Sequence, residues 1–329
     1  MKHILSVDQF SMDDLNDLLE RASYHFRVYS YDKSSLSPLP RNGHRWFYDQ
    51  GNQRWVPSWV SGKILANLFY EPSTRTSSSF YSAMVRLGGH VIPINEAGTY
   101  SSAVKGESLE DTIRTMNCYS DMIVLRHHEA GAAHRAAAVS EVPIINAGDG
   151  AGEHPTQALL DLMTILSERG WCGGPPNEIL HGITVTMMGD LKHGRTVKSL
   201  AKLLDKFGID HINWVSPDEL RIPEEFVGLP DIQTSELNDV IAETDILYLT
   251  RAQKERHGLP KDLLATGDAP YGISAEHMAK AKSDMVLMHP LPRVNELPTE
   301  LDSDPRSAYF RQMKYGLYVR MAVLESVLE

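Results

Sequence analysis

The chain has 329 residues, of which 42% are hydrophobic and 23% are charged, as is usual for a globular protein with more than one domain. Its 32 basic and 43 acidic residues give a net charge of −11, which argues against general binding to nucleic acids or anionic membranes. With only Cys118 and Cys172, a disulfide framework is not expected. The first residues lack the apolar stretch of a signal peptide, and no apolar run reaches membrane-spanning length, so we expect a cytoplasmic protein.

The N-terminal part of the chain combines a helical pattern with a long irregular segment. Ser11 is a good N-cap and is followed by leucines at helical spacing, which predicts a helix from Ser11 to about Arg27. Residues 32–61 are rich in Pro, Ser, Gly and Asn and contain three tryptophans. We interpret this segment as a surface insertion held by its aromatic side chains, and a patch that binds a partner is the alternative.

From Lys63 onward, strand-like apolar runs alternate with helical patterns. A second alternating series begins at Ile183, after a break rich in Gly and Pro at Gly170–Pro176. Such alternation predicts parallel sheets with right-handed crossovers. We therefore expect an α/β fold with two doubly wound domains, each a parallel sheet flanked by helices, and a cleft between them. The expected domains are residues 1–150 and 151–305, with residues 306–329 as a C-terminal helix that packs back on the first.

Six short polar clusters each follow the C-terminal end of an apolar run. Ligands bind at that edge of open α/β sheets, so we expect the clusters to converge on one crevice. Most of their residues are Arg, Ser, Thr, His or Gln, which suit phosphate and carboxylate groups. The clusters are Glu71–Thr76, Arg126, His154–Gln157, Gly189–Arg195, Arg251–Gln253 and His289–Arg293.

The first cluster has the composition of an anion site. Ser73, Thr74, Arg75 and Thr76 lie between a strand and a helix, where unpaired N–H groups and the helix dipole favour a phosphate. The alternative is a helix cap with a surface arginine. Lys105 lies in a polar stretch, where it is either a solvated side chain or a cation that a mobile loop brings to the phosphate.

Three further residues suit a carbonyl group. Arg126 ends an apolar strand, where a charge is costly unless it faces a ligand or forms a structural ion pair. His154 stands near a helix N-terminus, which favours a neutral imidazole that donates to a carbonyl oxygen or caps the helix. Gln157 lies one turn further along the same face.

The last three clusters suit an amino dicarboxylate. Arg195 and Arg251 can each bind one carboxylate through two nitrogens, although either alone is more typical of a solvated surface charge. The carbonyl groups of Leu291 and Pro292 can accept hydrogen bonds from an amine. The alternative for that segment is a rigid loop shaped by its prolines.

Taken together, the six motifs resemble the aspartate transcarbamoylase family in residues, order and spacing over nearly the whole chain outside 32–61. This resemblance implies transfer of a carbamoyl group from carbamoyl phosphate to the amine of L-aspartate, in de novo pyrimidine synthesis. It implies no metal and no cofactor. It also implies a homotrimer with active sites shared between chains, and it leaves open a regulatory or pathway partner chain.

The resemblance also implies the roles of individual residues. The catalytic residues would be Arg75, Thr76, Lys105, Arg126 and His154. The substrate-binding residues would be Ser73, Thr74, Ser101, Gln157, Arg195, Arg251, Gln253, Leu291 and Pro292. The loop with Ser101 and Lys105 would come from a neighbouring subunit.

Three other functions remain as alternatives. A transcarbamoylase for ornithine is disfavoured, because that branch has Cys in place of Pro290 and because two arginines suit a dicarboxylate. A catalytically silent scaffold would be expected to lose its motifs, which are all present. A nucleotide-dependent dehydrogenase is disfavoured because no Gly-x-Gly-x-x-Gly follows a strand. The chain departs from the family pattern at Ser77, where a basic residue is common, and in the length of the segment before Lys63.

Overall fold

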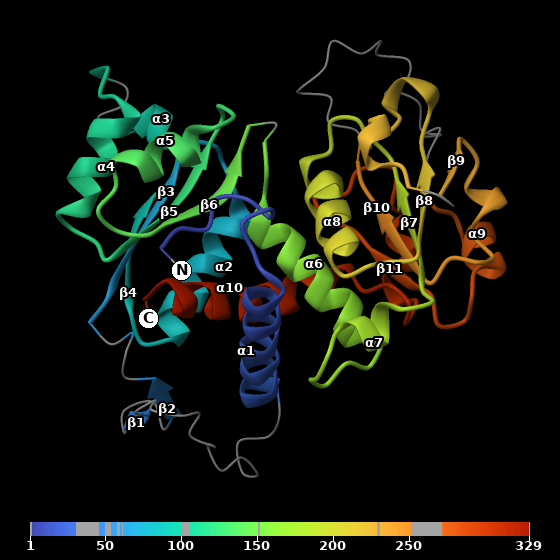
Figure 1. Ribbon diagram of the computed structural model, residues 1–329, viewed down its shortest axis with the longest axis horizontal. Helices are drawn as coiled ribbons and strands as arrows, with labels where there is room; N and C mark the ends of the chain where they lie inside the picture. Colours follow the sequence, from blue (N-terminus) through green and yellow to red (C-terminus); the bar gives the residue numbers. More distant parts are fainter. Residues whose placement is uncertain are drawn as a thin grey trace. The chain divides into compact units, whose positions relative to one another are not determined.

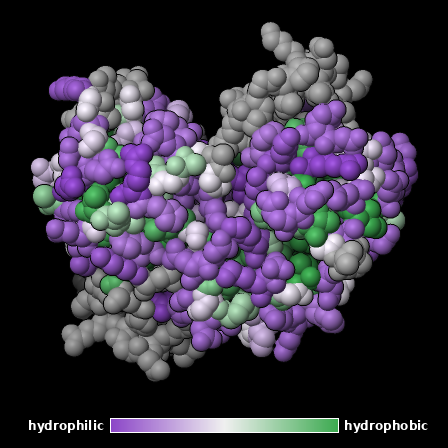
Figure 2. All heavy atoms as spheres, turned by 45° about the horizontal axis from the view of Figure 1, so that its top comes forward, coloured by the Kyte–Doolittle hydropathy of each residue, from purple (hydrophilic) through white to green (hydrophobic). Residues whose placement is uncertain are grey.

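The protein comprises two compact units, Met1–Thr156 with Tyr315–Glu329 and Gln157–Lys314 (Figure 1). The computed structural model describes residues 2–30, 46–49, 54–57, 60, 62–100, 105–150, 152–228, 231–251 and 272–328. Within these ranges, no helix combines the length and the apolar composition that a membrane crossing requires. On the face drawn in Figure 2, most side chains are hydrophilic and the hydrophobic ones form scattered groups.

The first unit is built on a four-stranded sheet with the order β4-β3-β5-β6, in which all neighbours are parallel. A helical connection follows each strand and returns the chain to the start of the next, as parallel pairing requires. The strands are Ile64–Phe69 (β3), His90–Ile94 (β4), Met122–His127 (β5) and Ile144–Asp149 (β6). The helices are Met12–Ser30 (α1), Thr74–Arg86 (α2), Ala97–Tyr100 (α3), Leu109–Asn117 (α4), Ala132–Val139 (α5) and the C-terminal part of Tyr309–Leu328 (α10).

Helices cover both faces of this sheet (Figure 1). On one face, buried side chains of α4 and α5 pack against those of β3 and β5, as Ile113 and Ala136 do with Leu68. On the other face, α2 buries Phe80, and the Arg320 guanidinium of α10 lies 5.2 Å from the centroid of that ring. This arrangement confirms the predicted parallel sheet flanked by helices.

The second unit contains a five-stranded sheet with the order β11-β10-β7-β8-β9, which is also parallel throughout. Its strands are Thr184–Met188 (β7), His211–Val215 (β8), Ile232–Thr234 (β9), Ile246–Leu249 (β10) and Val286–Met288 (β11). Its helices are Asn177–Leu180 (α7), Arg195–Lys206 (α8), Ala275–Lys280 (α9) and most of Pro155–Glu168 (α6). The described residues of this unit also form 3₁₀ turns at Asp218–Leu220 (η2), Glu224–Phe226 (η3), Leu237–Asp239 (η4) and Thr299–Ser303 (η7).

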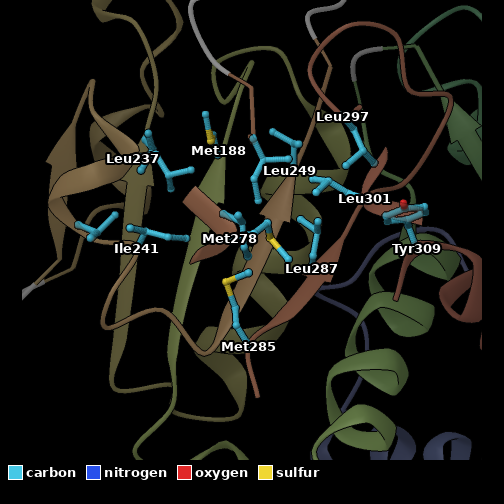
Figure 3. Packing of buried hydrophobic residues seen from close by; sticks show 14 of the residues in the cluster. Met188, Leu237, Ile241, Leu249, Met278, Met285, Leu287, Leu297, Leu301 and Tyr309 are labelled. Atoms are coloured by element: carbon cyan, nitrogen blue, oxygen red, sulfur yellow. The ribbon is translucent and has the colours of Figure 1, made fainter. Parts of the chain in front are cut away.

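A hydrophobic cluster of the second unit lies on one face of this sheet (Figure 3). Met188, Leu249 and Leu287 of three adjacent strands meet Met278 of α9 there. The opposite face of β10 carries Tyr248, which is fully buried. Because successive side chains of a strand point to opposite faces, an unbroken apolar strand such as β10 indicates burial on both sides.

The insertion at 32–61 contains regular structure that the sequence analysis did not predict. Trp46–Asp49 (β1) pairs antiparallel with Arg54–Pro57 (β2), with Tyr48 opposite Trp55. Aromatic and β-branched residues favour strands, and Pro, Gly and Asn elsewhere in the segment masked this local preference. Trp59 lies outside the described residues, and the alternative of a partner-binding patch stays a prediction.

Gly189 holds the end of β7 against the end of β10. Its φ is +120°, and a Cβ placed on it would lie 2.1 Å from the carbonyl oxygen of Thr250. No side chain fits there without moving the backbone of one strand. The polar clusters that begin at Gly189 and Arg251 follow these two strand ends. The contact between Gly189 and Thr250 therefore sets how closely the starts of the two clusters approach each other.

We expect Gly189→Ala to lower the free energy of unfolding by at least about 3 kcal/mol, because strained backbone and a clash with main chain combine. Gly208→Ala is the matched control in the same unit. Gly208 also has a positive φ, +69°, but an added Cβ would meet nothing within 4 Å. Its substitution should cost about 1 kcal/mol. Urea denaturation measures both, and equal costs would contradict the role given to the Thr250 contact.

Candidate active site

Three predicted clusters follow adjacent strands of the first unit. The loop that starts at Glu71 follows β3, Arg126 lies near the end of β5, and His154 comes shortly after β6. In the strand register Phe69 is opposite Arg126, and the Tyr70 amide donates to the Arg126 carbonyl at 2.8 Å. Parallel pairing therefore brings these residues to the carboxyl edge of one sheet, where α/β proteins bind ligands.

The start of α2 has the features of an anion site. Ser73 is the N-cap residue with extended backbone, its side chain makes no capping hydrogen bond, and the first turn has no acidic residue. Thr74 and Arg75 are exposed, whereas Thr76 is 6% exposed. An N-terminus without an acidic side chain keeps the favourable end of the helix dipole for a bound anion.

Ser77, which directly follows the first cluster, anchors this helix start. Its hydroxyl accepts a hydrogen bond from the Asn67 side chain at 3.0 Å and donates to Asn95 Oδ1 at 3.0 Å. Asn67 belongs to β3 and Asn95 directly follows β4, so Ser77 fixes the first turn of α2 to two strands. Sequence reasoning missed Asn67, although a single Asn inside an apolar strand is a signal for such a contact.

Arg126 forms an ion pair with Glu71, which belongs to the first cluster. Its Nε donates to Glu71 Oε2 at 3.1 Å, and the two side chains are 16% and 26% exposed. The structural ion pair considered as the alternative for Arg126 therefore exists. It also orients the guanidinium at the strand edge, because a bond through Nε fixes the plane of the group.

His154 is 3% exposed and directly precedes α6. Its Nδ1 lies 3.4 Å from the Thr156 hydroxyl. The turn before it is organised by Asp149, whose Oδ1 accepts from the Glu153 amide at 3.1 Å and whose Oδ2 accepts from the Gly131 amide at 2.9 Å. Asp149 was not among the predicted site residues, yet it holds the backbone that carries His154.

The predicted subunit-donated loop is described only in part. Lys105 is exposed, and Ser101 lies outside the described residues. The same is true of Gln253 in the second unit.

In the second unit, three clusters follow three adjacent strands, β7, β10 and β11. Arg195 begins α8 and is 6% exposed, and Arg251 follows β10. The loop after β7 is held by Asp190, which is fully buried and accepts from the His193 amide at 3.1 Å. The arginines thus follow neighbouring strands at one edge of this sheet, as two groups for a dicarboxylate would have to do.

The loop after β11 is organised around a buried histidine. His289 Nδ1 accepts from the Leu291 amide at 2.8 Å, so Nε2 carries the proton and donates to Glu296 Oε1 at 3.0 Å. Burial lowers the pKa of His289, and the hydrogen bond and charge of Glu296 oppose that shift only partly. A neutral imidazole therefore holds Leu291, whose φ is +55° and which precedes a cis proline, Pro292.

Arg293, the last residue of this cluster, is engaged within the unit. It binds both carboxylate oxygens of Asp302, and its guanidinium lies 5.5 Å from the centroid of the Tyr309 ring. The hydrogen bonds from Arg293 and Tyr309 lower the pKa of Asp302 to about 2. Arg293 thus anchors the loop, which explains why the motif ends with a basic residue.

Each predicted residue that the structure describes lies in one unit or the other. Ser73, Thr74, Arg75, Thr76, Lys105, Arg126 and His154 belong to the first unit, and Gln157, Arg195, Arg251, Leu291 and Pro292 belong to the second. Convergence of both sets on one crevice stays a prediction. No group of three His, Cys, Asp or Glu side chains that could hold a metal occurs among the described residues.

Comparison with known families gives matches over both units. The model of the aspartate/ornithine carbamoyltransferase carbamoyl-P binding domain matches residues 2–167. The model of the Asp/Orn binding domain of the same family matches residues 181–327.

Curated relatives include aspartate carbamoyltransferases and a multifunctional protein. The aspartate carbamoyltransferase catalytic subunit of Clostridium botulinum is 49% identical over 274 residues, which cover 81% of this chain and 86% of the relative. The chloroplastic aspartate carbamoyltransferase of Arabidopsis thaliana is 48% identical over 82% of this chain and 68% of the relative. The multifunctional protein URA2 of Saccharomyces cerevisiae is 46% identical over 99% of this chain, which spans only 14% of that protein's length.

Solved structures agree with these matches. Aspartate transcarbamoylase from Trypanosoma cruzi, in complex with carbamoyl phosphate and aspartate, is 42% identical and has a TM-score of 0.84. The match covers 100% of this chain and 97% of that one. The same enzyme in complex with N-(phosphonacetyl)-L-aspartic acid gives a TM-score of 0.85.

We expect acid to destabilise the protein partly through His289. Its folded pKa lies below the ordinary 6.5, so the stability that the neutral imidazole contributes is present above pH 6.5 and is lost as pH falls. His289→Gln should therefore flatten the decline of unfolding free energy between about pH 7 and pH 5, by up to about 1.4 kcal/mol per pH unit.

Urea denaturation at several pH values measures this slope. His134→Gln is the control, because an exposed imidazole has similar surroundings in the folded and unfolded chains. An identical slope for wild type and His289→Gln would contradict the role of the buried imidazole.

Proposed function

Because this chain belongs to the aspartate/ornithine carbamoyltransferase family, we propose that it transfers the carbamoyl group of carbamoyl phosphate to the amine of L-aspartate. The products are N-carbamoyl-L-aspartate and phosphate, in de novo pyrimidine synthesis. The observation that carries the choice of aspartate is the pair Arg195 and Arg251, which follow adjacent strands next to the His289–Pro292 loop. Two guanidinium groups suit the two carboxylates of aspartate and would repel the second amine of ornithine.

The first unit supplies the groups for carbamoyl phosphate. Ser73, Thr74, Arg75 and Thr76 bind the phosphate at the start of α2. The carbonyl oxygen of the carbamoyl group accepts hydrogen bonds from Thr76, Arg126 and His154. These donors stabilise the negative charge that develops on that oxygen during attack. The ion pair of Arg126 with Glu71 supports this role, because it orients the guanidinium before substrate binds.

The second unit supplies the groups for aspartate. Arg195, Arg251 and Gln253 bind its carboxylates, and the carbonyl groups of Leu291 and Pro292 accept hydrogen bonds from its amine. The neutral amine attacks the carbonyl carbon and forms the C–N bond. Cleavage of the C–O bond to phosphate follows, and the departing phosphate, neutralised by Arg75 and Lys105, accepts the amine proton. No metal or covalent intermediate takes part in this scheme.

The two roles correspond to two domains. We assign carbamoyl phosphate binding mainly to residues 1–150 with 306–329, and aspartate binding to residues 151–305, with His154 and Gln157 at the start of the second range contacting the carbamoyl group. The order of the matching family models along the chain supports this assignment.

The active form is proposed to be a homotrimer in which Ser101 and Lys105 enter the site of a neighbouring subunit. A regulatory or pathway partner chain is compatible with this form, since the matching region of URA2 is one part of a multifunctional protein. A cytoplasmic location is proposed because the chain contains only two cysteines, Cys118 and Cys172, so a disulfide framework is not expected.

Arg126→Ala should lower kcat for carbamoyl-aspartate formation by at least about 100-fold, because one donor to the developing oxyanion is lost. A colorimetric assay of carbamoyl-aspartate measures this, with L-ornithine as the alternative acceptor. Arg114→Ala is the matched control. Arg114 is an exposed arginine in the last turn of α4, which returns the chain to the start of β5, away from the carboxyl edge.

Full activity in Arg126→Ala would refute the oxyanion role. Product with ornithine and none with aspartate would place the chain in the other branch of the family. A wild-type chain without activity toward either acceptor would favour the silent scaffold.

Mixing Lys105→Ala with Arg126→Ala tests the shared site. If Lys105 acts in a neighbour's site, each mixed trimer contains one site free of both substitutions. Random mixing of the two inactive variants should then restore up to roughly a quarter of wild-type activity. The readout is activity after the subunits are dissociated and reassembled together, compared with each variant treated alone. No recovery, with trimers verified by light scattering, would contradict the sharing of sites.

A further inference from the structure

A buried carboxylate in α6 contacts one of the proposed substrate-binding residues. Asp161 is fully buried, and its Oδ1 accepts a hydrogen bond from Gln157 Nε2 at 2.8 Å. The same oxygen accepts from Gln312 Nε2 at 2.6 Å, and Oδ2 accepts from the Tyr248 hydroxyl at 2.8 Å. These residues come from α6, β10 and α10, and all belong to the second unit.

The contact determines which way the Gln157 amide faces. An ionised carboxylate can only accept hydrogen bonds, so the NH₂ end of the amide must point toward Asp161. The carbonyl end, Oε1, then points away from it. Among the described residues, no donor binds Oε1. Buried side-chain atoms without a partner include other atoms but not this one, so Oε1 keeps contact with solvent. Oε1 is therefore the end of the Gln157 amide that faces a ligand.

Asp161 is itself held on several sides. The Gln312 amide is used at both ends, since its Oε1 accepts from the His289 amide at 3.0 Å while its NH₂ group donates to Asp161. Burial and the negative charge of Asp161 raise the pKa of Tyr248 well above its ordinary value, so its hydroxyl remains a donor. A carboxylate with three fixed donors has little freedom to rotate.

We infer that Asp161 is a positioning residue that presents Gln157 Oε1 as the acceptor for the NH₂ group of the carbamoyl substrate. This inference rests on the proposed function. Without Asp161, the amide can turn by 180° and present its NH₂ group, which cannot accept a hydrogen bond from another NH₂ group. The arrangement thus selects a carbamoyl group over an acyl group of similar size.

Acetyl phosphate is the probe for this selection. It has the phosphate and carbonyl of carbamoyl phosphate but a methyl group in place of NH₂, so it makes no hydrogen bond with Gln157 Oε1. The quantity measured is the ratio of the dissociation constants of acetyl phosphate and carbamoyl phosphate, obtained by calorimetry without aspartate. A general loss of structure weakens the binding of both ligands and leaves the ratio of their dissociation constants similar. A turned Gln157 amide weakens only the binding of carbamoyl phosphate and so lowers the ratio.

Asp161→Leu should lower this ratio roughly tenfold, the value of one well-formed hydrogen bond. Asp161→Asn keeps an oxygen toward Gln157 and Gln312 and can donate to the Tyr248 oxygen, so it should restore most of the ratio. Tyr248→Phe is the matched control from the same buried cluster, because it removes a donor to Asp161 and leaves the Gln157 contact in place. It should keep the wild-type ratio. If Asp161→Leu does not fold, Asp161→Ser replaces it, since a serine hydroxyl is too short to reach both amides.

The outcomes separate the two proposals. An unchanged ratio in the folded Asp161→Leu or Asp161→Ser protein would overturn the positioning role and leave the proposed function intact. An equal fall of the ratio in Tyr248→Phe would also overturn the positioning role, because disturbed packing of the buried cluster would then explain the effect. A wild-type chain that binds neither phosphate ligand and forms no carbamoyl-aspartate would refute the proposed function and this inference with it.

Discussion

In both units, every strand of the main sheet runs parallel to its neighbours, so each connection must return along the sheet before the next strand begins. Each strand therefore delivers the loop that follows it to the same edge. This constraint explains why residues as far apart in the chain as Glu71 and Arg126 form an ion pair, and why Arg195 and Arg251 follow neighbouring strands. The residues proposed to bind substrate therefore follow the carboxyl ends of the strands.

That edge requires polar groups to be buried, which is costly unless each has a partner. The protein meets this requirement with short local networks. Asp149 holds the turn before His154, Asp190 holds the loop after β7, and His289 holds Leu291. In each case a buried side chain binds backbone amides, which fixes the shape of the loop without using the side chains proposed to bind substrate. These hydrogen bonds thus fix the backbone at the turns that carry the proposed binding groups.

Residues outside the predicted binding set also hold the proposed binding residues in place. Asp161 lies inside α6 with no exposed surface, and its contacts to Gln157, Gln312 and Tyr248 join segments that are up to 151 residues apart. Ser77 was not among the predicted site residues, yet it ties α2 to two strands. Both act on proposed binding residues through geometry and not through contact with substrate.

The sequence by itself determined the alternation of strands and helices, the parallel class of the sheets and the six clusters at strand ends, because period and turn residues are local properties. It also determined the family, because the motifs occur in order at fixed spacing. Only the tertiary structure decided which buried side chains hold those clusters, since Asp149 and Asp161 gain their roles from contacts that no local pattern encodes. It also decided that Trp46–Asp49 and Arg54–Pro57 pair as antiparallel strands, where strand preference prevailed over a composition typical of loops. The physical reason is the same in both cases: pairing energies depend on partners that the chain brings together only when it folds.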